Sequence, residues 1–118
     1  MKPPIIIVDG HDVSIYDSVE EAQVQLEAID VRNGEYRAYD AEGRLLAMDI
    51  VAEKKRVLLG LIPTDVELVR MSDGEAAPTH ERELRKALIA FLVATGSVAE
   101  VVDALTTSEL VERAKGVG

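Results

Sequence analysis

The sequence predicts an α+β fold: a mostly antiparallel sheet of five to six strands, one early helix, and two to three C-terminal helices packed on one face of the sheet. Short β-branched segments separated by turn residues fill residues 1–71. After the polar segment 72–78, the apolar spacing changes to steps of three and four. Strands therefore come first and helices last, which distinguishes α+β from alternating α/β order.

The chain of 118 residues fits one domain spanning residues 1–118. Within it we expect residues 1–71 to form a strand-rich part that contains one helix, residues 72–78 to form a linker and residues 79–118 to form a helical part. The domain is long enough to bury a core without disulfides, and it has no cysteine with which to form them.

The first predicted element is a β-hairpin. Residues 5–8 are apolar and β-branched, as in a strand buried on both faces. Residues 9–12, Asp-Gly-His-Asp, are turn formers, and residues 13–16 then alternate between apolar and polar side chains. Two strands joined by a tight turn are the expected result.

A helix is predicted to begin at Ser18 and to end near Asn33-Gly34. The Ser18 hydroxyl can accept a hydrogen bond from the amide of Glu21, and the Glu21 side chain can reach back, as in a capping box. One apolar stripe follows at helical spacing, and it consists of Val19, Ala22, Leu26 and Ile29.

The next segment is rich in predicted strands. Residues 35–39 form a strand with Tyr36 and Tyr39 on opposite faces, and residues 40–43 form a turn in which Gly43 can take a positive φ. Residues 44–51 form a longer strand. We expect a charged turn at 53–55, a central strand at 56–62, a break at 63–65 and one more strand at 66–71.

The C-terminal part is predicted to be helical. Thr79 is the expected N-cap of a helix that ends at Gly96, with one apolar side composed of Leu84, Leu88, Phe91, Leu92 and Thr95. Two further capping boxes are predicted at residues 97–100 and 106–109. The apolar residues behind them are Val98, Val101, Val102 and Leu105, then Leu110, Val111 and Ala114, before a stop at Gly116.

Charge is distributed unevenly along the chain. The net charge is −9 overall, and residues 9–49 alone carry eleven acidic residues against three arginines. This balance argues against nucleic acids and anionic membranes as partners, because both require basic protein surfaces. A basic protein is the partner that the acidic half favours.

No cofactor, metal or catalytic residue is predicted. Glycine-rich phosphate loops and cysteine ligands are missing from the sequence. His11 lies in a tight turn between Asp9 and Asp12, where three ligands do not converge, and His80 follows a predicted helix start without an obvious partner. A small enzyme with an unrecognised site remains an alternative. No secretory signal or membrane span is apparent, so we expect a cytoplasmic protein.

The predicted contact surface is acidic with one aromatic anchor. The carboxylates belong to the first helix and to the turn that follows the next strand, and they would form one patch if those two elements are neighbours. The expected contact residues are Asp17, Glu20, Glu27, Asp30, Asp40 and Glu42, with Tyr39 as the anchor.

Residues 5–50 resemble small acidic bacterial immunity proteins, which neutralise a cognate toxin by binding it. The resemblance rests on the small acidic chain, on residues 16–22 (YDSVEEA) at the start of the helix and on residues 39–46 (YDAEGRLL). It implies an inhibitor that covers the active site, or a nearby surface, of a basic toxin such as a nuclease. The alternative is a structural or regulatory homodimer in which the strand at 56–62 pairs with a second chain.

Overall fold

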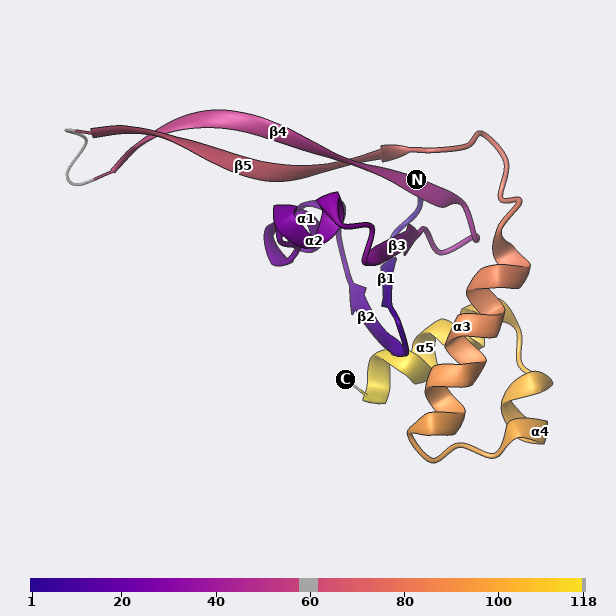
Figure 1. Cartoon of the computed structure of the whole chain (residues 1–118). Coiled ribbons are helices and arrows are strands. Elements are labelled where there is room, and N and C mark those ends of the chain that lie inside the picture. Colours follow the sequence, from indigo (N-terminus) through magenta and orange to yellow (C-terminus); the bar gives the residue numbers. More distant parts are fainter. Residues whose placement is uncertain (58–61, 118) are drawn as a thin grey trace.

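The computed structural model describes residues 1–57 and 62–117, with side chains described outside 53–65. Within these residues the fold is α+β, with a five-stranded antiparallel sheet and five helices (Figure 1). The elements are β1 Ile5–Asp9, β2 Asp12–Tyr16, α1 Val19–Gln25, α2 Ala28–Arg32, β3 Tyr36–Tyr39, β4 Leu45–Val57, β5 Ile62–Asp73, α3 Glu81–Ala94, α4 Ala99–Asp103 and α5 Thr107–Val117.

The strand order in the sheet is β2-β1-β3-β4-β5. The predicted hairpin is confirmed: β1 and β2 pair from Ile5↔Tyr16 to Asp9↔Asp12. On its other side β1 pairs with β3, and Asp9 lies opposite Tyr36. Strand β1 is therefore central within the β2-β1-β3 part of the sheet.

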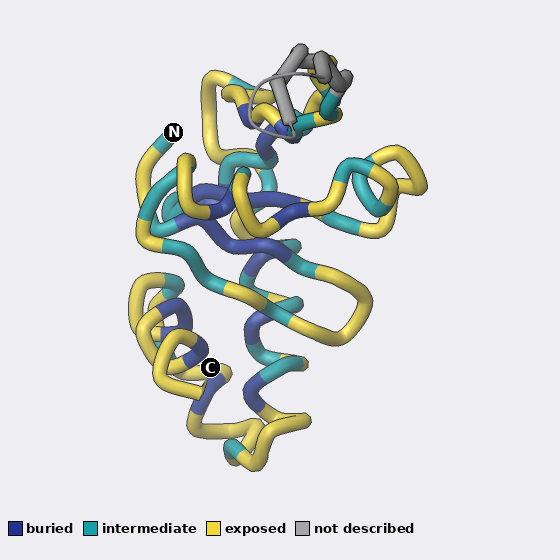
Figure 2. Tube along the Cα trace, turned by 90° about the vertical axis from the view of Figure 1, so that its left-hand side faces the viewer, coloured by how far each residue is buried: buried dark blue, intermediate teal, exposed yellow. Residues whose placement is uncertain are grey.

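Alternate residues of β1 enter two different hydrophobic cores. Ile6 packs with Tyr39 of β3 and with the buried faces of α3 and α5. Ile5 and Ile7 enter the opposite core, which lies beside α1 and the first part of the β4–β5 hairpin. Figure 2 shows the buried residues along the central strands and along the sides of the helices that face them.

The first helix begins as predicted but is interrupted. Ser18 accepts a hydrogen bond from the Glu21 amide over 3.1 Å, so this cap is confirmed. Leu26 and Glu27 then have extended backbone angles, and α2 starts a new axis at Ala28. The bend buries Leu26 but leaves Ile29 59% exposed. The prediction of one continuous stripe ending at Ile29 is therefore wrong.

Strands β4 and β5 form one long hairpin rather than three shorter strands. Residues 53–55 lie inside β4 and residues 63–65 lie inside β5, so the predicted charged turn and strand break are wrong. The predicted central strand at 56–62 is divided: Arg56 and Val57 belong to β4, Ile62 belongs to β5, and 58–61 lie outside the described residues.

Pro63 is tolerated because of its position on an edge strand. The Met71 amide donates to Gln23 Oε1 over 2.8 Å, so the Met71 N–H points away from β4. Residues two apart in a strand direct their N–H groups to the same side. The continuous register from Leu46↔Asp73 to Val57↔Ile62 therefore places Pro63, like Met71, with its missing N–H on the outer edge. No β4–β5 hydrogen bond is lost there.

The β4–β5 hairpin extends past the rest of the sheet as an arm, which is about 35 Å long from residue 47 to Val57 at ordinary strand rise (Figure 1). Helices α1 and α2 lie against its first part. The Arg32 side chain of α2 pairs with Glu67 of β5 over 2.8 Å. The two short helices thus support the arm as far as Glu67, which lies opposite Ala52 near the middle of the arm.

The predicted apolar side of α3 is confirmed for its leucines, whereas Phe91 is half-buried and Thr95 is exposed. Leu84, Leu88 and Leu92 are buried, and Gly96, with φ of 111°, follows the C-cap. The linker differs slightly from the prediction, because residues 72 and 73 belong to β5. The N-cap is His80 rather than Thr79, whose hydroxyl instead donates to Glu75.

The last two capping boxes have different outcomes. Thr106 and Glu109 exchange the two predicted hydrogen bonds, over 3.0 and 3.2 Å, ahead of α5. The box at 97–100 is not formed: the N-cap of α4 is Val98, with no side-chain cap. Val98 and Val101 are exposed, whereas Val102 is buried. Helix α5 also continues through Gly116 instead of stopping there.

Candidate acidic interface

Four carboxylates gather around Tyr36, and we call Asp9, Glu27, Asp30 and Glu35 the acidic cluster. The sheet register places Asp9 of β1 beside Tyr36 of β3. The Tyr36 hydroxyl donates to Asp30 Oδ2 over 3.0 Å. The Glu35 amide donates to the Asp30 carbonyl over 3.0 Å, which closes the turn between α2 and β3.

The carboxylates of the acidic cluster repel one another. A hydrogen bond with Asp30, the negative charge of Asp30, some burial and the charge of Asp9 together raise the pKa of Glu35. Burial, the hydrogen bond to Asp30 and the surrounding carboxylates raise the pKa of Tyr36 to about 12. In the described part of the chain, no lysine or arginine forms an ion pair with the cluster. The cluster therefore holds uncompensated negative charge at the surface.

Large apolar side chains are exposed on the same two helices. Ile29 lies next to Asp30 in α2 and is 59% exposed, and Val24 of α1 is 79% exposed. Exposed apolar groups beside charged groups are a common composition for a protein-binding surface, with an apolar centre and a polar rim. We call the acidic cluster together with exposed Ile29 and Val24 the α1–α2 surface. The exposed apolar side chains distinguish it from an ordinary solvated helix face.

The structure separates the predicted contact residues between the two ends of the sheet. Glu27 and Asp30 belong to the acidic cluster, at the Asp9 end of β1. Asp17 follows Tyr16, which pairs with Ile5 at the opposite end of β1. These ends are about 13 Å apart at the usual rise of a strand. The antiparallel register thus divides carboxylates that are close in sequence.

The remaining predicted acids at the Ile5 end have different surroundings. Asp17 is exposed and pairs with Lys115 of α5 over 2.6 Å. Glu20 is exposed in the first turn of α1. Glu42 pairs with Arg44 and, over 3.7 Å, with Lys2. The negative charges of Asp17 and Glu42 are therefore already compensated by the protein's own cations.

Tyr39 and Asp40 are corrections to the predicted contact surface, because both are buried. The Tyr39 ring is 1% exposed in the core with Ile6, and its hydroxyl accepts a hydrogen bond from Arg37 Nε over 3.1 Å. Neighbouring residues of a strand face opposite sides of the sheet. Ala38 belongs to the core beside α1, so Tyr39 faces α3 and α5. The tyrosine beside the carboxylates is Tyr36.

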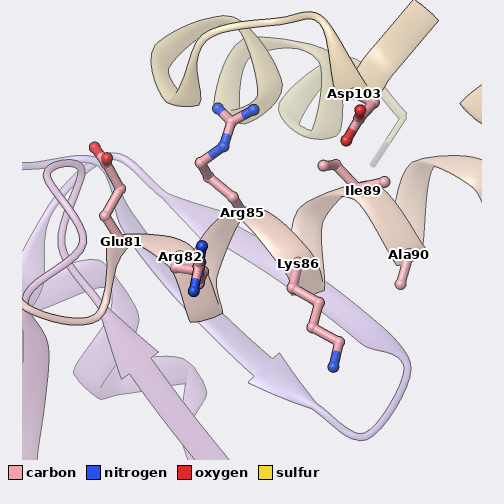
Figure 3. A pocket seen from close by; sticks show the side chains of 7 residues that line it. All are labelled: Glu81, Arg82, Arg85, Lys86, Ile89, Ala90 and Asp103. Carbon is pink, nitrogen blue, oxygen red and sulfur yellow. The ribbon is translucent and has the colours of Figure 1, made fainter. Parts of the chain in front are cut away.

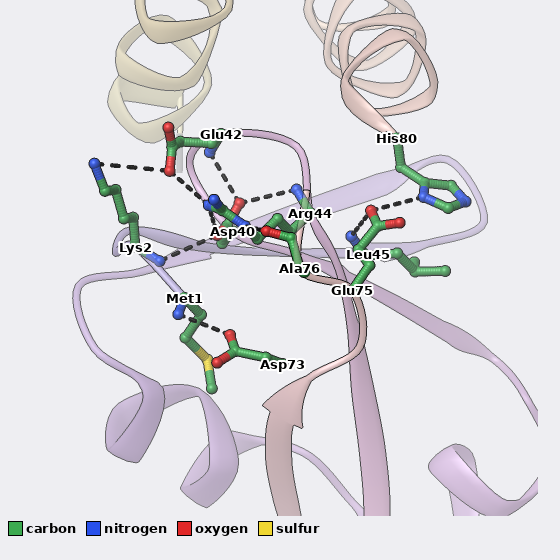
Figure 4. A network of polar contacts seen from close by, with 10 residues as sticks. All are labelled: Met1, Lys2, Asp40, Glu42, Arg44, Leu45, Asp73, Glu75, Ala76 and His80. Atoms are coloured by element: carbon green, nitrogen blue, oxygen red, sulfur yellow. Dashed lines mark hydrogen bonds and ion pairs between the residues drawn. The ribbon is translucent and has the colours of Figure 1, made fainter. Parts of the chain in front are cut away.

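Asp40 is a structural hub rather than a surface charge (Figure 4). Its carboxylate accepts hydrogen bonds from the amides of Lys2, Glu42 and Arg44 and from the Arg44 guanidinium, over 2.9–3.2 Å. Burial alone would raise the pKa of Asp40, but these hydrogen bonds outweigh burial and lower it. The side chain fixes the turn at 40–44 and joins it to the N-terminal segment.

His80 does have a partner, which the sequence reasoning missed. Its Nδ1 lies 2.8 Å from Glu75 Oε1, and the Glu75 carboxylate also accepts from the Leu45 amide over 2.9 Å (Figure 4). The Thr79 hydroxyl donates a further hydrogen bond to Glu75. These contacts, led by that from Thr79, lower the pKa of Glu75 to about 2. The partner precedes His80 by five residues in a loop, where helical spacing gives no signal.

One hollow lies along α3 and has basic and acidic walls. It measures about 630 Å³ and is lined in part by Arg85, Lys86 and Asp103. Arg85 donates to the Leu105 carbonyl over 2.8 Å and to Thr107 over 3.2 Å. Figure 3 shows Arg85 pointing toward the C-terminal helices and Lys86 pointing away from them, so these cations do not converge on one point.

Comparisons of the chain with known protein families, curated proteins and solved structures give no match. Among the described residues, no helix is long and apolar enough to cross a membrane. Nor do histidine, aspartate and glutamate side chains in this part of the chain form a group suited to a metal ion.

Proposed function

We propose that the protein is a non-enzymatic binding protein that inhibits a basic protein, such as a nuclease toxin, through the α1–α2 surface. The observation that carries this proposal is the gathering of four mutually repelling carboxylates around Tyr36, beside exposed Ile29, with no lysine or arginine of the described chain paired to them. A cationic partner would relieve that repulsion on binding.

The physical basis is electrostatic attraction combined with an apolar contact. Negative potential attracts a positively charged protein and orients it before contact. Exposed Ile29 and Val24 supply apolar area that a partner can remove from water. Glu27, Asp30, Glu35 and Asp9 form the charged rim of this surface, and Tyr36 fixes Asp30 within it. Glu20 would contribute to long-range attraction only, whereas Asp17 and Glu42 are already paired with the protein's own cations.

The setting we propose follows from composition and charge. A chain without cysteine is compatible with the reducing cytoplasm, and it needs no cofactor for binding. Its net charge of −9 disfavours nucleic acid and anionic lipid as direct ligands.

The test is a binding titration with charge-reversed variants. A basic protein that co-purifies with the wild type, or is encoded beside it, is titrated against wild type and against Glu27→Lys/Asp30→Lys. We expect at least a tenfold weaker association for the variant at low salt and a smaller difference at high salt. If the partner is a nuclease, its activity should fall with equimolar wild type and recover with the variant.

The matched control is Glu100→Lys/Glu112→Lys, which makes the same change in net charge at exposed positions of α4 and α5. The control should bind nearly as well as wild type. Equal weakening by both double variants would show that only net charge matters, and an unchanged affinity for Glu27→Lys/Asp30→Lys would place the interface elsewhere.

A further inference from the structure

Strand β4 has a long edge that no strand of the described chain covers. Its pairs with β3 are Ala38↔Leu46 and Tyr39↔Leu45, and none is formed beyond Leu46 in that direction. From residue 47 to Val57, β4 is paired only with β5. A two-stranded ribbon is marginally stable on its own, and an open edge is a template for another strand.

The direction of the main-chain groups along this edge follows from two hydrogen bonds. The Leu45 amide donates to Glu75, on the β5 side, so odd-numbered residues of β4 face β5. The Met71 amide of β5 leads to the same assignment. It points away from β4, and Met71 lies opposite Met48, so the main-chain groups of Met48 point away from β5. Even-numbered residues of β4 therefore present their N–H and C=O groups to the open edge, and these are Met48, Ile50, Ala52, Lys54 and Arg56.

We propose that this edge pairs with the same edge of a second copy of the chain, antiparallel and with the two-fold axis at Ala52. In this register Ala52 lies opposite its own copy, Ile50 opposite Lys54, and Met48 opposite Arg56. All of these are outward-facing residues, so each pair can exchange both main-chain hydrogen bonds, about ten bonds in total. An isologous pairing of this kind closes as a dimer and leaves no edge for a third copy.

Charge complementarity favours a second copy of the chain as the partner that pairs with the open edge of β4. The proposed register places Asp49 opposite Lys55 of the other chain, and the two-fold axis repeats this opposite-charge pair. The other odd-numbered pairs are Val51 with Glu53 and Ala47 with Val57, so no like charges face each other.

The outer edge of β5 is less suited to such pairing. Pro63 has no N–H to offer, and the Met71 N–H is already bonded to Gln23. Proline and capped amides are common means of blocking an edge strand. The contrast between one blocked and one open edge favours pairing through β4 alone.

The experiment measures mass against concentration by analytical ultracentrifugation for five proteins: wild type, Ala52→Pro, Asp49→Lys, Lys55→Asp and the double variant Asp49→Lys/Lys55→Asp. Wild type should shift from monomer to dimer as its concentration rises. Ala52→Pro removes an outward N–H while keeping the β4–β5 ladder, and it should be monomeric. Each single charge variant should weaken the dimer at least tenfold, and the double variant should restore it.

Folding of each variant is checked by circular dichroism, and the Glu27→Lys/Asp30→Lys protein serves as a separate control. That protein should dimerise like wild type, which distinguishes this inference from the proposed function. A wild type that remains monomeric at all concentrations overturns the inference and leaves the edge to a different partner. So does a dimer that persists with Ala52→Pro, or one that the double charge variant fails to restore.

Discussion

The Tyr36 hydroxyl and the Asp30 carboxylate are joined by a hydrogen bond of 3.0 Å that ties β3 to α2 at the centre of the acidic cluster. The bond places a neutral donor among carboxylates that no lysine or arginine neutralises in the described chain. It also connects the edge of the α1–α2 surface to the sheet.

Asp30→Asn should lower the pKa of Tyr36 from about 12 toward its ordinary value of 10.0. The substitution removes one negative charge and weakens the acceptor, whereas the effect of burial remains, so the pKa should stay above 10.0. An alkaline titration followed by tyrosinate absorbance, with Tyr36→Phe to assign the signal, measures the change. Asp17→Asn, at the opposite end of the sheet, should leave the Tyr36 titration unaltered.

Glu35→Gln should raise the melting temperature at pH 7 and low salt. Because folding raises the pKa of Glu35, the native state is penalised as pH rises above the ordinary value of 4.5 and through the folded pKa. A neutral glutamine is free of that penalty. The gain should shrink in high salt and below pH 4.5, and Glu100→Gln should show no comparable gain. Stabilisation that is equal at all salt concentrations would contradict the electrostatic explanation.

Glu75→Gln should reduce stability at neutral pH but not in strong acid. The pKa of Glu75 is lowered from 4.5 to about 2, so its contribution is complete above pH 4.5 and is lost as pH falls through 2. Urea unfolding at a series of pH values should show the variant and the wild type converging across this window. Glu112→Gln is the control, and a constant difference at every pH would argue against a role for the ionised carboxylate.

Leu88→Ala should destabilise the protein by about 2–5 kcal/mol, because it leaves a cavity in a fully buried position of α3. Leu88→Asp should prevent folding, because it buries a charge without a partner. Val101→Ala is the matched control at an exposed helical site and should cost far less. Denaturant unfolding measures both, and a Leu88→Asp protein that melts like wild type would refute the observed packing of α3.

Local signals predicted the parts of the fold that depend on neighbouring residues. The β1–β2 hairpin, the caps at Ser18 and Thr106 and the Leu84–Leu88–Leu92 face were all readable from spacing and turn chemistry. The errors arose where long-range geometry overrides a local signal. Pro63 suggested a break, but on an outer edge its missing N–H costs nothing.

The candidate site was less predictable than the fold. Glu27 and Asp30 were found from the charge pattern, but Asp9 and Glu35 were missed, because their proximity to Tyr36 depends on the pairing of β1 with β3. The alternation of the strand places Tyr36 and Tyr39 on opposite sides of the sheet, but it does not show which side is covered by helices, so it does not reveal that Tyr39 is the buried one. Once the strand order is known, the register resolves both points.

The three consecutive isoleucines of β1 bind the two halves of the molecule into one cooperative unit. Ile6 belongs to the core beneath α3 and α5, and its neighbours on either side belong to the core beneath α1. Neither core can melt while the other keeps β1 in place, so heating should produce a single transition. Because β1 belongs to both cores, hydrogen exchange at its central amides should require complete unfolding. A fragment that ends before α3 would expose Ile6 and Tyr39 to water.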